Sequence, residues 1–426
     1  MVERTILDDC FLHDKDRLKH EEALAILKAA VAPVVRTQTV RLEEASGRVL
    51  AEPVTSPRAV PADDNSAVDG YAFAFADYEA TGGFFPVVER IAAGHPAASP
   101  LPVGAAARIF TGAVMPGRAD SVAMQEDCER HDQDGQDFVV IPPGLKQGAN
   151  CRLAGEDLAS GDAVAVSGQR LRPQDIAAIA STGLAKISVF KPIKVALFST
   201  GDEIVRPGAP LGEGQVYDSN HYLLHALLQT VGAEISDLGV LSDNEKKVAV
   251  ALASAAAGHH AVLTTGGASR GEEDHLVTTL DRLGKRHLWQ LAIKPGRPMT
   301  FGQIGKTVVL ALPGNPVAAF VCFLLYVRPV FSVLSGAGWL DPPRFAIPAG
   351  FAIEKKKPGR REFLRGTLIR DNGRLEVQKF ARDGSGLITS LRQADGLIEL
   401  DEATTEVRRG DPVAFIPFSA LGLTMS

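Results

Sequence analysis

Acidic residues follow three apolar segments that are typical of buried parallel strands: they are Glu203, Asp243 and Asp274. In a parallel sheet the carboxyl ends of the strands meet at one edge, where ligands bind. We therefore expect the three carboxylates to lie in one cleft, beside the basic pair Lys294 and Arg297. Mg²⁺ typically takes one or two carboxylates together with substrate oxygens, so the pattern favours a magnesium site next to a bound phosphate. The alternative is that each acid only caps the following helix, which explains a single acid readily and all three together less well.

Two glycine-containing turns lie in the same stretch, each between an apolar segment and a helical pattern. The first spans residues 265–274 (TGGASRGEED) and the second spans residues 313–316 (PGNP). Such turns expose backbone N–H groups, and the following helix N-terminus adds partial positive charge, which suits a bound anion. Each turn alone is equally compatible with an ordinary connection between a strand and a helix. The sequence contains no Walker A lysine motif and no GxGxxG, which argues against a P-loop kinase and a Rossmann dehydrogenase.

Length and composition indicate a large globular protein. A chain of 426 residues is too long for a single core and predicts several domains. The net charge of −6 argues against bulk nucleic-acid binding, because no basic excess exists to neutralise a phosphate backbone. The four cysteines form no CxxC pair, which fits a reduced, cytoplasmic compartment and argues against a zinc site. The N-terminus lacks the apolar core of a secretion signal. The apolar run 317–334 contains Arg328 and Pro329 and predicts a buried helix rather than a membrane span.

Strand and helix patterns alternate between residues 194 and 336. The predicted strands are 195–199, 234–241, 261–264, 288–293 and 308–312. The predicted helices are 221–231, 244–257, 273–283 and 316–335. Asp218 and its neighbours offer N-caps for the first helix, and Ser242 with Glu245 has capping-box spacing for the second. This alternation predicts a central three-layer α/β domain with a mainly parallel sheet.

The segments outside this region have other patterns. Residues 54–150 contain short apolar runs between Gly, Pro and Asp clusters, which predicts an all-β module. Because helical patterns flank it at 17–31, 42–50 and 173–181, we expect the β module to be inserted into a split helical domain. A hairpin pattern at 367–377 predicts a β-barrel-like C-terminal domain. The predicted domains are a split helical domain (1–60 and 151–191), an inserted β domain (61–150), an α/β substrate-binding domain (192–336) and a C-terminal β domain (337–426).

Five motifs together resemble the signature of the MoeA family of molybdopterin molybdenumtransferases, which is related to the E domain of gephyrin. They are DNSAVDGYA at 64–72, TGDE at 200–203, TGGASRGEED at 265–274, IKPGRP at 293–298 and LPGNP at 312–316. Their order and spacing match the family from about residue 15 to residue 415. Composition alone would make the first motif a solvated turn, since Asp, Asn, Ser and Gly are favoured there. In combination, the five motifs are specific to the MoeA family.

The resemblance implies a molybdenum insertase that binds molybdate and adenylated molybdopterin, transfers the metal to the dithiolene, and cleaves the adenylate with Mg²⁺ to release AMP. The family's activity positions correspond to Asp69, Thr111, Asp157, Glu203, Asp243, Asp274 and Lys294. Asp243 and Asp274 are expected to bind Mg²⁺. Substrate contacts are expected from Thr265, Gly266, Gly267, Ser269, Gly271, Arg297, Pro313, Gly314, Asn315, Pro316, Arg365 and Ser385. The last two resemble the family's molybdate site, where an arginine fork and a hydroxyl suit an oxyanion.

The resemblance also implies a homodimer with a shared active site. In it the β module of one protomer faces the α/β domain of the other, so that Asp69 and Thr111 complete the partner's site. Further partners would be the molybdopterin adenylyltransferase and molybdoenzyme apoproteins or their chaperones, with no role for nucleic acid or membrane. Gln290 stands where the family often has a lysine, which leaves substrate affinity and the choice between molybdate and tungstate open.

Two other functions are compatible with parts of the pattern. The first is the adenylyltransferase of the preceding step, whose family has a similar α/β domain. The 64–69 loop, the inserted β module and the C-terminal β domain disfavour it. The second is a protein-binding scaffold that has lost catalysis, and the intact acidic and basic positions argue against that loss.

Overall fold

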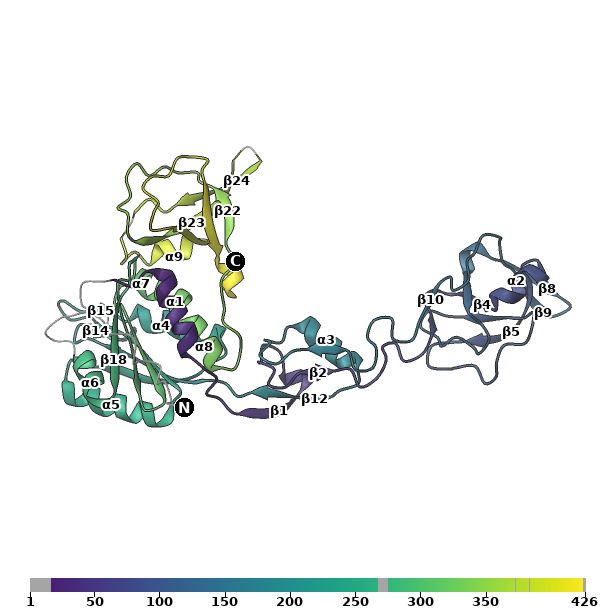
Figure 1. Cartoon of the computed structure of the whole chain (residues 1–426), viewed down its shortest axis with the longest axis horizontal. Helices are drawn as coiled ribbons and strands as arrows, with labels where there is room; N and C mark the ends of the chain where they lie inside the picture. The colour runs from purple at the N-terminus through teal and green to yellow at the C-terminus, as the bar shows by residue number, and fades with distance from the viewer. Residues whose placement is uncertain (1–16, 267–274, 372, 383, 424–426) are drawn as a thin grey trace.

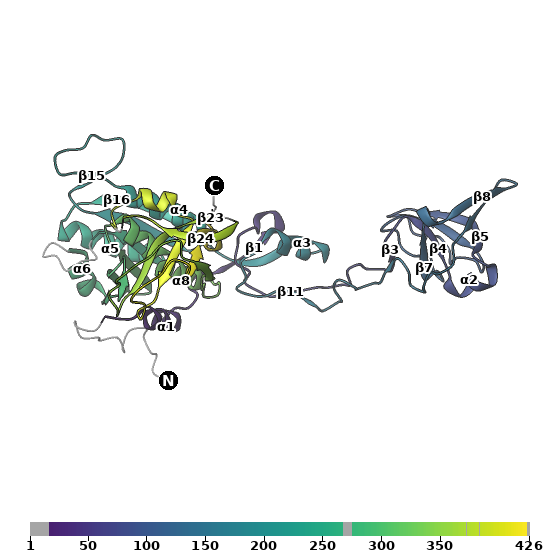
Figure 2. The same cartoon turned by 90° about the horizontal axis from the view of Figure 1, so that it is seen from above.

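The computed structural model describes residues 17–266, 275–371, 373–382 and 384–423, without the side chains at 30, 286–290 and 371. The chain is elongated (Figure 1): the α/β domain and the C-terminal β domain lie at one end, a small linking unit follows, and the inserted β module lies at the far end. The view from above shows the same separation (Figure 2). Two extended segments join the module to the linking unit, as an insertion requires.

A six-stranded sheet forms the centre of the α/β domain, in the order β16-β13-β17-β21-β20-β18. The bounds are β13 Lys194–Thr200, β16 Glu234–Leu241, β17 Ala261–Thr265, β18 Lys285–Gln290, β20 Pro298–Ile304 and β21 Thr307–Leu312. Strands β16, β13, β17 and β21 are parallel to one another. Strand β20 runs antiparallel to β21, and β18 runs antiparallel to β20. The expected parallel sheet is therefore present, extended by an antiparallel pair.

The strand predicted at 288–293 is wrong as a single element. Strand β18 ends at Gln290, and β19 (Ile293–Lys294) instead pairs with β23 (Arg361–Asp371) of the C-terminal domain. Strand β20 was missed, because its proline and glycine weaken a strand pattern. Its Gly302 has a packing role, since a Cβ there would lie 2.6 Å from Cδ2 of Leu280.

Helices cover both faces of the sheet. They are α4 (Ser219–Thr230), α5 (Glu245–Gly258) and α6 (His275–Leu283). Alternate residues of β13 point to opposite faces: Leu197 packs in the core that contains α4, and Phe198 in the core that contains α5 and α6. The predicted cap of α4 is confirmed, because Asp218 accepts a hydrogen bond from the backbone of His221 at 3.0 Å. The predicted capping box of α5 is wrong, because Asn244 is the N-cap and accepts from the backbone of Lys247 at 3.1 Å.

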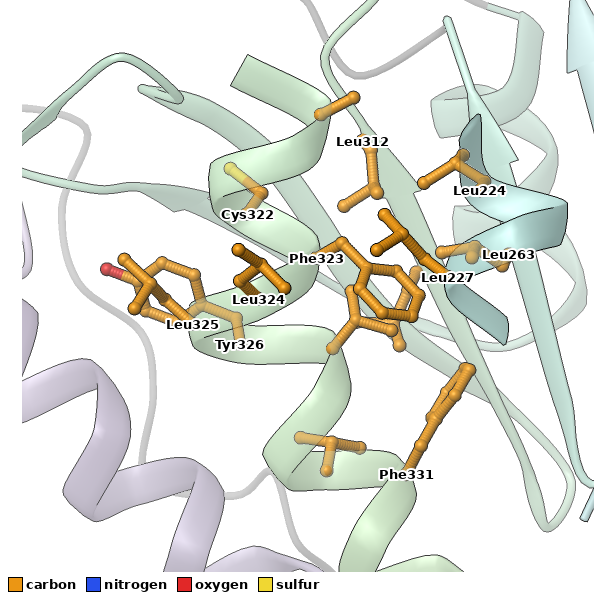
Figure 3. Packing of buried hydrophobic residues seen from close by; sticks show 14 of the residues in the cluster. Leu224, Leu227, Leu263, Leu312, Cys322, Phe323, Leu324, Leu325, Tyr326 and Phe331 are labelled. Atoms are coloured by element: carbon orange, nitrogen blue, oxygen red, sulfur yellow. The ribbon is translucent and has the colours of Figure 1, made fainter. Parts of the chain in front are cut away.

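The long apolar helix lies at the centre of the core shared by α4, the sheet and the C-terminal domain. It comprises α7 (Pro316–Cys322), a π-helical segment (Phe323–Val327) and α8 (Arg328–Leu334). The helix of 19 residues is long and apolar enough to cross a membrane, with a mean hydropathy of 2.2 over an 18-residue window, yet 89% of that window is buried inside the protein. Figure 3 shows Phe323 directed toward Leu227 of α4, with Tyr326 on the opposite side. The helix is apolar all round because it is packed all round.

Tyr326 connects this helix to α1 (His20–Ala30). Its hydroxyl lies 2.8 Å from Nδ1 of His20. Burial lowers the pKa of His20 to about 3, so the imidazole is neutral and able to share this hydrogen bond. Helix α1 therefore packs on the α/β domain, where Leu27 joins the central core.

The linking unit is not the helical domain that the sequence predicted. Its pairs of short strands are β1 (Thr37–Arg41) with β12 (Lys186–Phe190) and β2 (Val54–Thr55) with β11 (Ala163–Ala165). The helix predicted at 173–181 is present as α3 (Pro173–Ser181). The helix predicted at 42–50 is reduced to a 3₁₀ turn (Leu42–Glu44), since Gly47 has a φ of +72° and interrupts a helix. Ala45 and Leu50, from the segment predicted as a helix, pack in one core with Ile179 of α3.

The β module contains a six-stranded sheet in the order β7-β4-β6-β5-β9-β8. The bounds are β4 Gly70–Phe73, β5 Phe84–Ile91, β6 Ala106–Ile109, β7 Ser121–Met124, β8 Glu129–Gln133 and β9 Gln136–Val140. The all-β prediction missed helix α2 (Phe75–Thr81). Asp77 in this helix receives hydrogen bonds from Arg118 at 2.8 Å and from the backbone of Gly104 at 2.9 Å. These contacts hold a helix too short for its periodicity to be recognised.

The C-terminal domain consists mainly of strands, with the short helix α9 (Thr389–Gln393). The strands are β22 Phe345–Pro348, β23 Arg361–Asp371, β24 Arg374–Lys379, β25 Gly396–Leu400 and β26 Pro412–Pro417. The predicted hairpin is confirmed, because β23 and β24 pair antiparallel with Leu368 opposite Val377. A barrel-like closure of this sheet stays a prediction, as do the domain limits. Strand β19 extends the sheet and thereby joins it to the α/β domain.

Candidate functional site

Asp202 and Asp243, where β13 and β16 end, are joined by two hydrogen bonds, each from the backbone N–H of one residue to the carboxylate of the other. The N–H of Asp202 donates to Oδ2 of Asp243 at 3.3 Å, and the N–H of Asp243 donates to Oδ1 of Asp202 at 3.1 Å. Glu203 follows Asp202 in the chain, and its side chain lies over Gly201, where an added Cβ would be 2.5 Å from Oε2 of Glu203. The structure thus brings Glu203 and Asp243 to one edge of the sheet. Asp202 was overlooked, although it stands inside the TGDE motif.

The first glycine turn requires a glycine at position 266. Gly266 has a φ of +87°, and a Cβ there would lie 2.7 Å from the carbonyl oxygen of Thr200. Its N–H donates to the carbonyl oxygen of Leu312 at 3.2 Å. The second turn lies alongside, since Oγ1 of Thr265 donates to the carbonyl oxygen of Pro313 at 3.4 Å. Thr265 and Gly266 are therefore in direct contact with the end of β21 and the second turn.

A cavity of about 250 Å³ lies between the α/β and C-terminal domains, next to the second turn. Its polar lining residues are Lys294, Arg297, Asn315, Arg360, Arg365 and Ser385. No acidic side chain lines the cavity among the described residues. The buried carboxylate of Glu362 contacts two of the lining cations from outside the cavity, at 3.8 Å from Nζ of Lys294 and 3.0 Å from Nε of Arg360. Four cations face the cavity with one nearby carboxylate, so its potential is positive and suits an anion.

Arg365 is 3% exposed and organises one wall of the cavity. Its Nε donates to Oγ of Ser390 at 3.0 Å, and Nη2 donates to the carbonyl oxygens of Arg382 at 2.8 Å and Gly384 at 3.3 Å. The segment thus held leads directly into Ser385. The carbonyl oxygen of Ser385 in turn accepts from the N–H of residue 317 at 3.1 Å. Arg365 and Ser385 therefore line the same cavity.

Asp69 and Thr111 form a second cluster in the β module. Oδ1 of Asp69 accepts from the N–H of Thr111 at 2.8 Å and from its hydroxyl at 2.7 Å. These two bonds lower the pKa of the Asp69 carboxyl, with a smaller contribution from the nearby charge of Arg108. Arg108 belongs to a groove in which guanidinium groups stack on Tyr71 and Phe110. Asp69 directly precedes β4 and Thr111 follows β6, and in a single chain these strands lie far from the α/β sheet (Figure 1).

Asp157, which is described, is not brought to either cluster, and several other expected residues lie outside the described part of the chain. Asp157 is exposed in the segment that returns from the module, where its N–H donates to the carbonyl oxygen of Val60 at 3.1 Å. Gly267, Ser269, Gly271 and Asp274 lie outside the described residues, as does the side chain of Gln290. Within the described part of the chain, no group of three or more His, Cys, Asp or Glu side chains is arranged to hold a metal ion.

Known proteins match this chain over nearly its whole length. Three family models match in order: the MoeA N-terminal region (domain I and II) at residues 18–183, a probable molybdopterin binding domain at 196–332, and the MoeA C-terminal region (domain IV) at 350–418. The chain belongs to the MoeA family. The expected MoeA resemblance is thereby confirmed.

Relatives and solved structures agree with this assignment. A molybdopterin molybdenumtransferase from Haemophilus influenzae is 37% identical over 388 residues, which cover 91% of this chain and 95% of that protein. Another from a Nostoc species is 35% identical over 389 residues, 88% of each chain. A crystal structure of a MoeA protein from Pyrococcus horikoshii OT3 matches with a TM-score of 0.80 at 29% identity, covering 94% of this chain and all of that one. The multidomain α/β fold with several sheets is thus that of the MoeA family.

Proposed function

We propose that this MoeA protein inserts molybdate into the dithiolene of adenylated molybdopterin, with Mg²⁺-dependent cleavage of the adenylate and release of AMP. Its curated relatives are named molybdopterin molybdenumtransferases, and the chain is accordingly a transferase of molybdenum cofactor biosynthesis. The observation that carries the finer proposal is the basic cavity beside the second glycine turn. It offers an oxyanion a site next to the surface on which we place the pterin and its phosphates.

Molybdate is a compact dianion, and the cavity offers it positive charges and hydrogen-bond donors that are already positioned. The buried guanidinium of Arg365 is held by three hydrogen bonds before any ligand arrives. Ser385 adds a hydroxyl, and Lys294 adds an ammonium whose charge Glu362 moderates. Fixed donors lose little freedom on binding, so preorganisation favours capture of the dianion.

The acids at the sheet edge fit a magnesium ion. In the pair formed by Asp202 and Asp243, one oxygen of each carboxylate accepts a backbone N–H, and carboxylate oxygens are the ligands that Mg²⁺ prefers. We propose Asp243 and Asp274 as ligands, with Asp202 as a further donor. Mg²⁺ bound there would stabilise negative charge on the adenylate phosphates. Glu203, folded over Gly201, would help to keep this edge acidic.

We also propose that the active site is shared within a homodimer in the cytoplasm. Asp69 and Thr111 lie in a module far from the sheet of their own chain, so they are available to a partner's sheet edge (Figure 1). Mixing two variants of impaired activity, Asp69→Asn and Lys294→Ala, would then restore part of the activity at limiting adenylate. Dimers that contain one chain of each kind hold one site with both residues intact. A mixture without any recovered activity would contradict the shared site.

The function itself is tested by asking which substrates are consumed. Purified protein is given adenylated molybdopterin, molybdate and Mg²⁺, or molybdopterin with ATP and Mg²⁺. We expect consumption of the adenylate with AMP release in the first mixture and no consumption of ATP in the second. The opposite pattern would assign the chain to the preceding adenylyl transfer. Loss of AMP release with EDTA, restored by excess Mg²⁺, is the expected control.

A further inference from the structure

Asn220 ties together the two glycine turns, although it lies in neither. It stands in the first turn of α4 and is 8% exposed. Its Nδ2 donates to Oγ1 of Thr265 at 2.8 Å and to the carbonyl oxygen of Gly314 at 2.7 Å. The amide thus spans residues 45 and 94 positions away, one in each turn. Both of its N–H protons are used in this way.

The same side chain leaves a buried polar atom without a partner. Oδ1 of Asn220 is shielded from solvent and accepts no hydrogen bond from any residue that the structure describes. An unmade bond at a buried acceptor is costly, and native proteins usually avoid it. A residue whose role were stability alone would gain from satisfying this oxygen. The side chain is instead oriented so that its two donors reach the two turns.

We propose that Asn220 is a positioning residue that sets the spacing between the two glycine turns for the bound adenylated pterin. The inference rests on the proposed function, because that function supplies a ligand held by both turns. Helix α4 provides a rigid base for the amide, since Asp218 caps its first turn. Thr265 and Gly314 follow separate strands. Within the described part of the chain, the side chain of Asn220 is hydrogen-bonded to both of them. A ligand that touches both turns then meets them at a fixed separation.

The test separates positioning from folding through a set of variants assayed for molybdate insertion. Asn220→Ala removes both tethers, and Thr265→Val removes one. Thr265→Ser keeps the hydroxyl and is the conservative rescue. Gln229→Ala removes an exposed amide from the same helix and serves as the matched control. We expect Asn220→Ala to raise KM for adenylated molybdopterin about 10- to 100-fold with kcat changed less than about threefold, because a binding surface is loosened rather than the reacting groups.

Combining the variants tests whether Asn220 and Thr265 act through the same contact. Asn220→Ala and Thr265→Val combined should raise KM by less than the product of their separate effects, because both break the same contact. Gln229→Ala should behave like the wild type, and Thr265→Ser should raise KM less than Thr265→Val does, because serine keeps the hydroxyl that Asn220 contacts. An unchanged KM in Asn220→Ala, or an increase that Gln229→Ala reproduces, would overturn the positioning role while leaving the proposed function intact. Failure of the wild type itself to convert the adenylate would instead refute the proposed function.

Discussion

Replacing Arg365 with lysine is the sharpest perturbation of the proposed oxyanion cavity. The change keeps the positive charge but removes the guanidinium fork that contacts Ser390, Arg382 and Gly384. A lysine ammonium replaces at most part of this set, because it is a point charge on a flexible stem. Arg365 is 3% exposed, so solvent does not screen the loss.

The size of the effect follows from these contacts. Hydrogen bonds to a charged group contribute about 1.5–3 kcal/mol each, so losing one or two net bonds should cost about 2–4 kcal/mol in holding the segment before Ser385. If that segment must be ordered to bind molybdate, the KM for molybdate should rise about 30- to 1,000-fold. The assay is AMP release at saturating adenylate over a range of molybdate concentrations.

The control is Arg370→Lys, which makes the same change at an exposed position of the same strand. It should leave the KM for molybdate at the wild-type value. A KM that stays unchanged in Arg365→Lys, even with a lowered unfolding temperature, would show that this arginine supports the fold without organising an oxyanion site.

Three further predictions follow from particular contacts. Lys294→Ala should weaken adenylate binding by about 1.5–3 kcal/mol, measured by calorimetry, and an unchanged Kd would exclude a phosphate contact. The hydrogen bonds from Thr111 lower the pKa of the Asp69 carboxyl in the folded protein. Their contribution to stability is therefore present above the unfolded pKa of that carboxyl, and it is lost as the pH falls through the folded pKa. Thr111→Val should raise the pKa of Asp69 in an NMR titration, and a pKa that stays low would assign the shift to another cause. Gly266→Ala should destabilise the protein by at least about 1–2 kcal/mol in chemical denaturation, because φ is +87° there. Gly314→Ala, with open space around the position, should change stability by less than about 0.5 kcal/mol, and equal losses in the two variants would contradict this reasoning.

The inner parallel strands β13, β17 and β21 could be predicted because they are buried on both faces. A strand such as β13 (Lys194–Thr200) then reads as a continuous apolar run, and the helices between the strands show their own period. Glu203 and Asp243 could be placed at one edge for the same reason, since the carboxyl ends of parallel strands meet. The turn at Gly266 was also predictable, because glycine is the residue that tolerates its conformation.

What could not be predicted depends on contacts between distant segments. The linking unit contains short strands whose partners lie far along the chain, and no local period identifies them. Strand β20 contains a glycine that local preference counts against a strand, yet α6 packs on that position. Asn220 was recognised as a helix-capping candidate, but its bonds to Thr265 and Gly314 appear only once the strands are side by side. Glu362 was missed similarly, because its contact with Lys294 crosses a domain boundary.

The most direct test of the proposed function is the stoichiometry of AMP release. Purified protein with bound adenylated molybdopterin and Mg²⁺ is titrated with molybdate, and AMP and the finished molybdenum cofactor are quantified in the same samples. We predict that AMP release requires molybdate and equals cofactor formation, one to one, up to saturation. Cofactor formed without AMP, or AMP released at the same rate without molybdate, would contradict the proposal that this MoeA protein couples metal insertion to cleavage of the adenylate.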